Sequence, residues 1–391
     1  MALPLSIPML LAGLLGVMAA PAWSRGPNLC TVERMETDPA SVEAPCSARL
    51  DTAKLSPKAR AEALHIRGKG RDRTGAAQLA LQDYEAAIVL QPKNGDLYAS
   101  RASARFNRND FEGGVADLQT ALQLDERNTR ALVSIGNLMI ESGQPDGLKL
   151  LDKALRIDPK QPFGLLFRLR AYAELGRWQE AFKDADALVA LPRKSLDRVS
   201  YRGRDGLPED FHIIALEERA KLFNARRQTA EAEADLNAAV AYKEGPQSYL
   251  ARGTFLFGKA GRETDALRDF DRLVDTQSHR AWFHSARAEL LLRLKRSAEA
   301  LEASERAIVI DDSEGVAYEI RGNALTQLGR FDEAFADFTT ALDRDPSLIP
   351  KHLARLEMAG YFPSRQPPTE MTPLLRDALK ACSLDPACRE R

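Results

Sequence analysis

The sequence is poor in the residues from which catalytic and metal sites are built. Its 391 residues include only five histidines and four cysteines. The histidines show no HxxxH spacing and no acid at a metal-ligand offset, and no CxxC pair occurs, so a zinc site is not expected. The phosphate-binding loop GxxxxGK[ST], the GxGxxG loop and the GxSxG elbow are also missing. We therefore predict no catalytic residue, metal or cofactor; a hydrolase with paired carboxylates is the enzymatic alternative, because aspartate and glutamate are plentiful.

The charge balance and the aromatic content exclude further classes of protein. The formal net charge is −1, without the basic excess of a general nucleic-acid-binding protein. Aromatic residues make up 7% of the chain, β-branched residues are sparse, and alanine, leucine and arginine are abundant, which favours helices over strands. With 44% hydrophobic and 28% charged residues, the chain can bury a large core and is not broadly disordered.

Only residues 1–22 form a long apolar run. They contain no charged side chain, and Ala20 and Ala22 put small residues at positions −3 and −1 of a cleavage site. We interpret this stretch as the signal peptide of an exported protein, which places the mature chain in the periplasm of a Gram-negative bacterium. An uncleaved membrane anchor is the alternative, although a span needs about 20 apolar residues and Pro4 and Pro8 interrupt this run.

The four cysteines are consistent with export. Cys30 and Cys46 lie in a polar N-terminal stretch, and Cys382 and Cys388 lie near the C-terminus. Their placement outside the helical body predicts two local disulfides, Cys30–Cys46 and Cys382–Cys388, formed in an oxidising compartment. Four cysteines allow three connectivities, and four unpaired thiols in a cytosolic protein are the other alternative.

Residues 315–348 read as two antiparallel helices joined by a tight turn. The first helix is expected from about 316 to 328, and Gly329 after it suits a left-handed C-cap. The second begins near 331 and ends before Pro346, which cannot continue a helix without losing a backbone hydrogen bond. Apolar side chains at helical spacing can fill the space between and beyond the helices; they are Tyr318, Leu325, Leu328, Phe331 and Phe338.

This stretch resembles a tetratricopeptide repeat at nearly every signature position. The resemblance implies an all-α fold, a right-handed α-solenoid of stacked helix hairpins, that serves as a non-enzymatic scaffold for binding other proteins. The residues that carry the resemblance are Tyr318, Gly322, Leu328, Gly329, Phe331, Ala334, Phe338, Ala341 and Pro346.

A period of about 34 residues extends the motif over most of the chain. Eight repeats are expected, four in 61–195 and four in 213–348, separated by an irregular connector at 196–212 that is rich in glycine and charge. Residues 23–60 are expected to form an extended N-terminal segment that is closed by the first disulfide and docks on the first helix pair. Residues 349–391 are expected to hold a capping helix and a disulfide-closed C-terminal segment.

Arginine recurs at offset 7 of the repeat and aspartate at offset 23. In an antiparallel hairpin these offsets face each other, so we predict a partly buried ion pair inside each such repeat. A set of unpaired, solvated charges is the alternative. In a sixth repeat Arg252 is displaced by one position. The five complete pairs are Arg67–Asp83, Arg101–Asp117, Arg168–Asp184, Arg219–Asp235 and Arg321–Asp337.

The resemblance also implies a concave groove lined by the first helix of each repeat. Asn137 and Asn323 stand at the offset where family members use asparagine to hold a peptide backbone or carboxylate, and Arg170 could supply a neighbouring cation. A merely solvated face is the alternative. The groove is mixed in charge, so a protein or peptide is expected rather than nucleic acid. The candidate groove residues are Lys69, Asn107, Arg130, Asn137, Phe163, Arg170, Lys221, Phe255, Trp282 and Asn323.

The predicted function is therefore that of an exported scaffold which binds a protein or peptide partner. The alternative is a cell-envelope protein that contacts peptidoglycan through residues 349–391. This second hypothesis rests on a faint resemblance of the AGYF and LLRDALKAC strings to a peptidoglycan-binding helical module. In this chain prolines stand in place of the glycine-rich loop that joins the helices of that module. The identity of the partner and the oligomeric state are not predicted.

Overall fold

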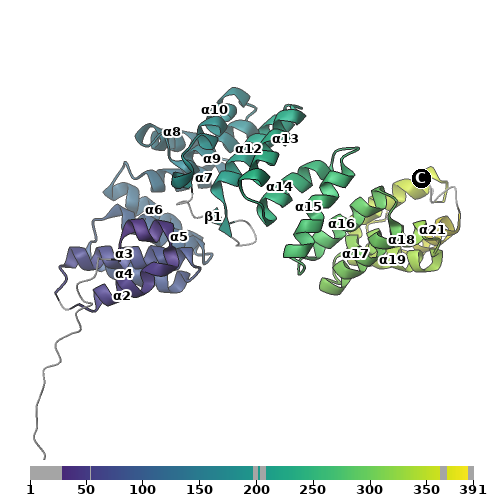
Figure 1. Cartoon of the computed structure of the whole chain (residues 1–391), viewed down its shortest axis with the longest axis horizontal. Coiled ribbons are helices and arrows are strands. Elements are labelled where there is room, and N and C mark those ends of the chain that lie inside the picture. The colour runs from purple at the N-terminus through teal and green to yellow at the C-terminus, as the bar shows by residue number, and fades with distance from the viewer. Residues whose placement is uncertain (1–28, 53, 197–200, 203–207, 362–367, 386–391) are drawn as a thin grey trace, which may run out of the picture. The chain divides into compact units, whose positions relative to one another are not determined.

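A computed structural model describes residues 29–52, 54–196, 201–202, 208–361 and 368–385 (Figure 1). The predicted signal peptide, residues 1–22, lies outside this range. In the part of the chain that is described, no helix is long and apolar enough to cross a membrane. The chain divides into two compact units, Met1–Ala131 and Leu132–Arg391, so the predicted connector at 196–212 falls inside the second unit.

The first unit begins with short helices and continues with helix hairpins. The helix pairs α3 with α4 and α5 with α6 each pack against each other. The elements are α1 (Val32–Thr37), the 3-10 helix η2 (Pro39–Val42), α2 (Glu43–Leu50), α3 (Pro57–Arg73), α4 (Ala77–Leu90), α5 (Gly95–Phe106), α6 (Phe111–Leu124) and the first residues of α7 (Thr129–Glu141).

The second unit is a longer series of hairpins, and Figure 1 shows α12 to α19 following one another as antiparallel pairs. The predicted all-α solenoid of stacked hairpins is confirmed. After α7, the elements are α8 (Gly147–Ile157), α9 (Pro162–Glu174), α10 (Trp178–Val189), α11 (Arg193–Leu196), β1 (Tyr201–Arg202), β2 (Pro208–Glu209), α12 (Phe211–Ala225), α13 (Thr229–Tyr242), α14 (Pro246–Phe257), α15 (Glu263–Thr276), α16 (Ala281–Arg293), α17 (Ser297–Ile310), α18 (Gly315–Gln327), α19 (Phe331–Arg344), the 3-10 helix η3 (Pro346–Leu348), α20 (Ile349–Met358) and α21 (Pro373–Leu384).

The turn inside every hairpin contains one residue in the left-handed region, always at the same offset of the repeat. A left-handed residue ends a helix by redirecting the chain, and it costs little only where the residue is glycine. At three of the eight positions the residue is not glycine, and the packed helices on either side hold it in the left-handed conformation. Because the offset is constant, the register of all eight repeats agrees with the sequence prediction. The positions are Gly75, Asn109, Gly143, Gly176, Arg227, Gly261, Lys295 and Gly329.

Small residues let the two helices of a hairpin approach closely. In the last hairpin Ala334 and Ala341 of α19 are almost fully buried. A Cβ atom on Gly322 of α18 would lie 2.8 Å from Cε1 of Phe338, so only glycine leaves room for the ring. Phe338 packs with Leu325 in a small buried cluster.

The N-terminal segment is helical, and the expectation of an extended chain is wrong. The prolines of this segment lie at helix starts and do not prevent helices from forming. Pro39 begins η2 and Pro45 lies in the first turn of α2, where a missing N–H breaks no helical hydrogen bond. Met35 and Val42 are buried in one cluster with apolar residues of α3. A Cβ on Gly70 of α3 would lie 2.6 Å from Val42 Cγ2, so this glycine permits the close docking.

The two predicted cysteine pairs differ in what the structure describes. The sulfur atoms of Cys30 and Cys46 lie 2.05 Å apart, at bonding distance, and both residues are buried. Cys382 of α21 is also buried. Its predicted partner, Cys388, lies outside the described residues.

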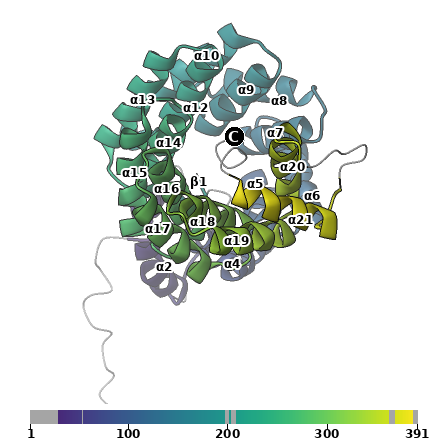
Figure 2. The ribbon, with the colours of Figure 1, turned by 90° about the vertical axis from the view of Figure 1, so that its right-hand side faces the viewer.

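The connector and the C-terminal segment have local structure of their own. The described residues of the connector pair as a short antiparallel ladder, with Tyr201 opposite Glu209, and the connector ends earlier than expected because α12 begins at Phe211. Beyond the last hairpin, α20 and α21 pack on α19, and Figure 2 shows α19 and α21 side by side. Leu353 and Leu356 of α20 are buried in this cap, whereas Met358, the last residue of α20, is 62% exposed.

Candidate partner-binding face

Each predicted arginine–aspartate pair is an ion pair inside its own hairpin. In every pair, Nε and Nη2 of the arginine donate to the two carboxylate oxygens over 2.6–3.0 Å. The displaced arginine of α14 makes the same contact with α15. The pairs are Arg67–Asp83, Arg101–Asp117, Arg168–Asp184, Arg219–Asp235, Arg321–Asp337 and Arg252–Asp269.

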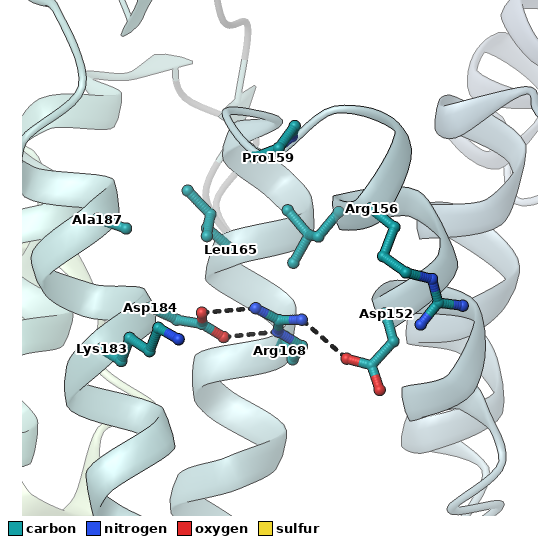
Figure 3. A pocket seen from close by; sticks show the side chains of 9 residues that line it. Asp152, Arg156, Pro159, Leu165, Arg168, Lys183, Asp184 and Ala187 are labelled. Carbon is teal, nitrogen blue, oxygen red and sulfur yellow. Dashed lines mark hydrogen bonds and ion pairs between the residues drawn. The ribbon is translucent and has the colours of Figure 1, made fainter.

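Figure 3 shows one of these pairs in a pocket of about 270 Å³ formed by α8, α9 and α10. Arg168 of α9 lies between two acids: it contacts Asp184 of α10, and its Nη1 donates to Asp152 of α8 over 2.8 Å. Burial lowers the pKa of Arg168, but the hydrogen bonds to Asp184 and Asp152 outweigh burial and raise it. The arginine's charge is neutralised within the protein, so this pocket has a structural role.

In the first unit, a basic cluster joins three successive first helices. Ser100 of α5 is buried, and its Oγ accepts a hydrogen bond from Nη1 of Arg130 (3.1 Å). The same Oγ lies 2.9 Å from Nε2 of His65 on α3. Burial, together with the charges of Lys69 and Arg130, holds the pKa of His65 well below its usual range, so the imidazole is neutral. Its Nε2 can then accept a hydrogen bond from the Ser100 hydroxyl.

Lys69 gives this cluster its unusual electrostatics. Burial, reinforced by the positive charge of Arg130, lowers the pKa of Lys69 to about 8. Asp72 accepts a hydrogen bond from the amide of Asn107 (2.8 Å), and Asp96 accepts one from the amide of Asn128 (2.8 Å). These amides do not cancel the charge of the two acids, and Asp96, together with Glu36, offsets part of the positive charge around Lys69.

In the second unit, Asn137 and Arg170, the residues predicted to hold a ligand carboxylate, each contact a side chain of the protein itself. Asn137 donates to Glu141 one helical turn along α7 (3.0 Å). Nη2 of Arg170 donates to Oε1 of Glu218 on α12 (2.9 Å), and Lys221 contacts the same carboxylate at 3.0 Å. Burial raises the pKa of Glu218, but the hydrogen bonds and charges of Arg170 and Lys221 together outweigh burial and lower it. The arginine expected to hold a ligand carboxylate therefore already holds an internal one.

The predicted aromatic groove residues are packed to different degrees. Phe163 stacks with Phe167, with ring centroids 5.8 Å apart, and is half-buried. Phe255 lies under the ammonium group of Lys259, which is 4.8 Å from the ring centroid. Trp282 is 39% exposed. Trp282 is therefore the most accessible of the three for stacking on a partner.

Asn323 of α18 lines a pocket of about 330 Å³ together with Thr326 and Gln327 of the same helix. Ser100 and Glu218, which organise the polar contacts of the two units, were not among the predicted groove residues. Neither occupies a groove-facing offset of the repeat, so the period contained no signal for them. In the described residues no group of three or more histidine, cysteine or acidic side chains is placed to hold a metal ion.

Comparison with known proteins agrees with the repeat geometry. A family model described as tetratricopeptide repeat matches residues 316–348, and a second model with the same description matches residues 256–315. The chain contains tetratricopeptide repeats. Repeats of this kind mediate interactions between proteins, on the surfaces that stacked hairpins create.

The curated relatives are similar to only part of the chain. The small glutamine-rich tetratricopeptide repeat-containing protein 2 of Saccharomyces cerevisiae is 29% identical over 102 residues, which are 26% of this chain and 30% of that protein. Hsp70-Hsp90 organizing protein 2 of Arabidopsis thaliana is 23% identical over 252 residues, 63% of this chain and 41% of that protein. The chain therefore spans less than half the length of either relative.

A solved structure has a similar arrangement of helices. A chain from the crystal structure of the APC/C hetero-tetramer Cut9–Hcn1 superposes with a TM-score of 0.52 at 13% sequence identity. The match covers 74% of this chain and 54% of that chain. At this identity the similarity establishes the arrangement of helices and nothing about the partner.

Proposed function

We propose that the protein is an exported, non-enzymatic scaffold that binds a protein or peptide partner on the face formed by the first helices of its repeats. The observation that carries this proposal is the basic cluster of the first unit. There, α3, α5 and α7 bring Lys69, Ser100 and Arg130 together, and the positive charge of Arg130 acts on the partly buried Lys69. Three helices from three repeats contribute to one polar surface, which is the arrangement that a bound segment of chain requires.

The charge of this cluster indicates the chemistry of the partner. A partly buried ammonium group with a pKa of about 8 and a neighbouring guanidinium favour a ligand that brings a negative charge. A carboxylate would raise the pKa of Lys69 toward its usual value and offset the cost of its burial. We infer that the bound segment is an acidic peptide, extended or helical.

Export is part of the proposal because of the N-terminal sequence and the cysteines. Residues 1–22 have the composition of a signal peptide, and the Cys30 and Cys46 sulfurs at bonding distance are typical of a protein that matures in an oxidising compartment. Cell fractionation and the intact mass of the mature protein test this. We expect a periplasmic product that begins at Trp23; a full-length cytosolic product would contradict export.

Photo-cross-linking in cells tests partner binding. A photoreactive residue at Ser103, exposed on α5 and next to the cluster, is compared with one at Val89, which is 81% exposed on α4. We expect the Ser103 probe to capture a defined protein, identified by mass spectrometry, and the double variant Lys69→Gln, Arg130→Gln to lose that product. Equal capture from Val89, or capture that survives the double variant, would contradict the proposal.

Contact with peptidoglycan through the C-terminal segment is the second candidate. In the described part of that segment, Leu353, Leu356 and Leu375 are buried in the cap, which accounts for its apolar residues without a glycan ligand. Co-sedimentation with purified sacculi, with and without residues 359–391, decides between the two. Retention that depends on this segment would favour the glycan-binding role.

A further inference from the structure

A seventh arginine occupies the bridging offset, beyond the last complete repeat. Arg355 stands 34 residues after Arg321, the same spacing that separates Arg67 from Arg101. It lies on α20, which begins where the first helix of a ninth repeat would begin. The cap therefore starts as a repeat, and Arg355 is the counterpart of the arginines that bind aspartate in the complete hairpins.

Arg355 has no acid of its own in the described part of the chain. Its Nε atom is buried without a hydrogen-bond partner. Its guanidinium lies 5.5 Å from the ring centroid of Phe338, a contact that supplies no acceptor for Nε. The aspartate of α21, Asp377, is exposed to solvent. A buried donor with no acceptor is costly, so a group that supplies one is bound with a corresponding gain.

The internal carboxylate whose charge acts on Arg355 also contacts two other side chains. Glu319 of α18 is buried, and it accepts a contact from Nζ of Lys351 at 2.7 Å. His352 Nε2 lies 3.4 Å from the same carboxylate oxygen. Burial itself raises the pKa of Glu319, but His352 and Lys351 outweigh burial and hold that pKa at about 2. Glu319 is thus compensated without Arg355.

Arg355 opens onto the pocket of about 330 Å³ that Asn323 also lines. Arg293 and Lys295 add two further cations to the lining, and no acidic side chain is part of it. Arg293 is already engaged, because its Nη2 pairs with Glu289 (2.5 Å) and its Nη1 donates to the Phe257 carbonyl (2.8 Å), so Lys295 and Arg355 supply the remaining positive charge. Leu292, Phe338 and Cys382 form the apolar part of the wall. The pocket therefore combines hydrogen-bond donors, positive charge and an apolar wall.

We propose that this pocket binds the carboxylate of an acidic side chain on a bound peptide, with Arg355 as its bidentate partner and Asn323 as a neighbouring donor. The partner would complete, from another chain, the ion pair that six complete repeats make internally. The five pairs at this offset, and the displaced pair of Arg252, each bind a planar carboxylate with two parallel hydrogen bonds, which is why we favour a carboxylate over a phosphate. The inference rests on the proposed binding of a peptide partner but involves none of the residues of the basic cluster.

A displayed library of random peptides provides the test, because it can be applied before the natural partner has been identified. The library is selected separately on the mature wild-type protein, Arg355→Gln and Lys69→Gln. We expect the wild-type selection to enrich a position with aspartate or glutamate, Lys69→Gln to keep that enrichment, and Arg355→Gln to lose it. Acidic enrichment that is absent from the wild type, or unchanged in Arg355→Gln, would overturn the inference. A library that yields no binder on any of the three proteins would count against the proposed function itself.

The selected peptide then gives a quantitative measurement. Replacing its acidic residue by the matching amide should weaken binding to the wild type about tenfold or more and leave binding to Arg355→Gln unchanged. Arg355→Lys should recover only part of the affinity, because an ammonium cannot form the bidentate contact. Displacement of the peptide by free acetate at the same carboxylate concentration would show that the pocket takes small anions, and would overturn the assignment to a peptide.

Thermal unfolding of the ligand-free protein controls for folding. Arg321→Gln removes half of an internal ion pair and should lower the melting temperature. Arg355→Gln removes no ion pair and should leave the melting temperature unchanged or higher. A marked loss of stability in Arg355→Gln would show that Arg355 is an internal structural residue, and would overturn the inference.

Discussion

Replacing Asp117 by asparagine tests whether the recurring ion pairs hold each hairpin together. Asp117 of α6 is 4% exposed and accepts from Arg101 through Nε and Nη2, over 2.8 and 2.7 Å. Arg105 contacts the same carboxylate at 3.0 Å. Asparagine keeps the shape of the side chain but removes its charge and turns one acceptor into a donor. Two guanidinium groups would then face a group that cannot neutralise them.

The magnitude follows from the burial of the two sides. Removing one partner of a buried ion pair costs about 3–5 kcal/mol. The side chains of Arg101 and Arg105 retain 16% and 23% of their exposure, so water can solvate part of the stranded charge. We therefore expect a loss near the lower end, about 3 kcal/mol. This corresponds to a more than hundredfold increase in the population of the opened hairpin.

Hydrogen exchange measures this loss where it occurs, because a repeat array can open locally without unfolding as a whole. We expect amides of α5 and α6 to exchange more than about a hundredfold faster in Asp117→Asn. The matched control is Asp312→Asn: Asp312 is 71% exposed and lies 3.4 Å from Arg344, so it should change the free energy of opening by less than about 1 kcal/mol. If amide exchange around the substitution is as slow in Asp117→Asn as in Asp312→Asn, the ion pairs do not stabilise the hairpins.

Three further predictions concern other parts of the chain. The pKa of Glu319 in the folded protein is about 2, below its ordinary value of 4.5, so the stabilising contribution of Glu319 should be complete above pH 4.5 and lost as the pH falls toward 2. Urea unfolding should show this loss of stability at acid pH in the wild type and a smaller loss in Glu319→Gln. Reducing the Cys30–Cys46 bond, whose residues are 16 apart, should destabilise the N-terminal helices by about 3 kcal/mol, measured by unfolding with and without reductant; identical curves would refute a stabilising bond. Gly322→Ala should cost about 1–3 kcal/mol by overpacking, whereas Gly258→Ala, which meets no atom within 4 Å, should be neutral in the same melting assay.

The repeat register could be predicted because it depends on local geometry. Each hairpin needs one left-handed residue at its turn, and the sequence supplies glycine at five of the eight positions. The remaining three, Asn109, Arg227 and Lys295, show that the packed helices on either side enforce the turn even where glycine is absent. The arginine and aspartate offsets were readable for the same reason, since both recur with the period.

Contacts that cross the period could not be read from the sequence. Arg170 and Glu218 are 48 residues apart, on either side of the connector, and no repeat-based rule pairs their offsets. The helices α1 and α2 are too short to be stable alone, so their formation depends on docking against α3. Arg355 did leave a signal, because extending the period by one repeat past Arg321 reaches it.

The ion pair within six of the hairpins has a consequence for how such a chain can change in length. Its two members belong to one repeat, so gaining or losing a whole repeat leaves each of these arginines matched with its aspartate or removes both. An array that stops in the middle of a repeat keeps the arginine without the aspartate, which is the situation of α20. We therefore expect the carboxylate of a partner to bind at α20, directly after the last complete repeat.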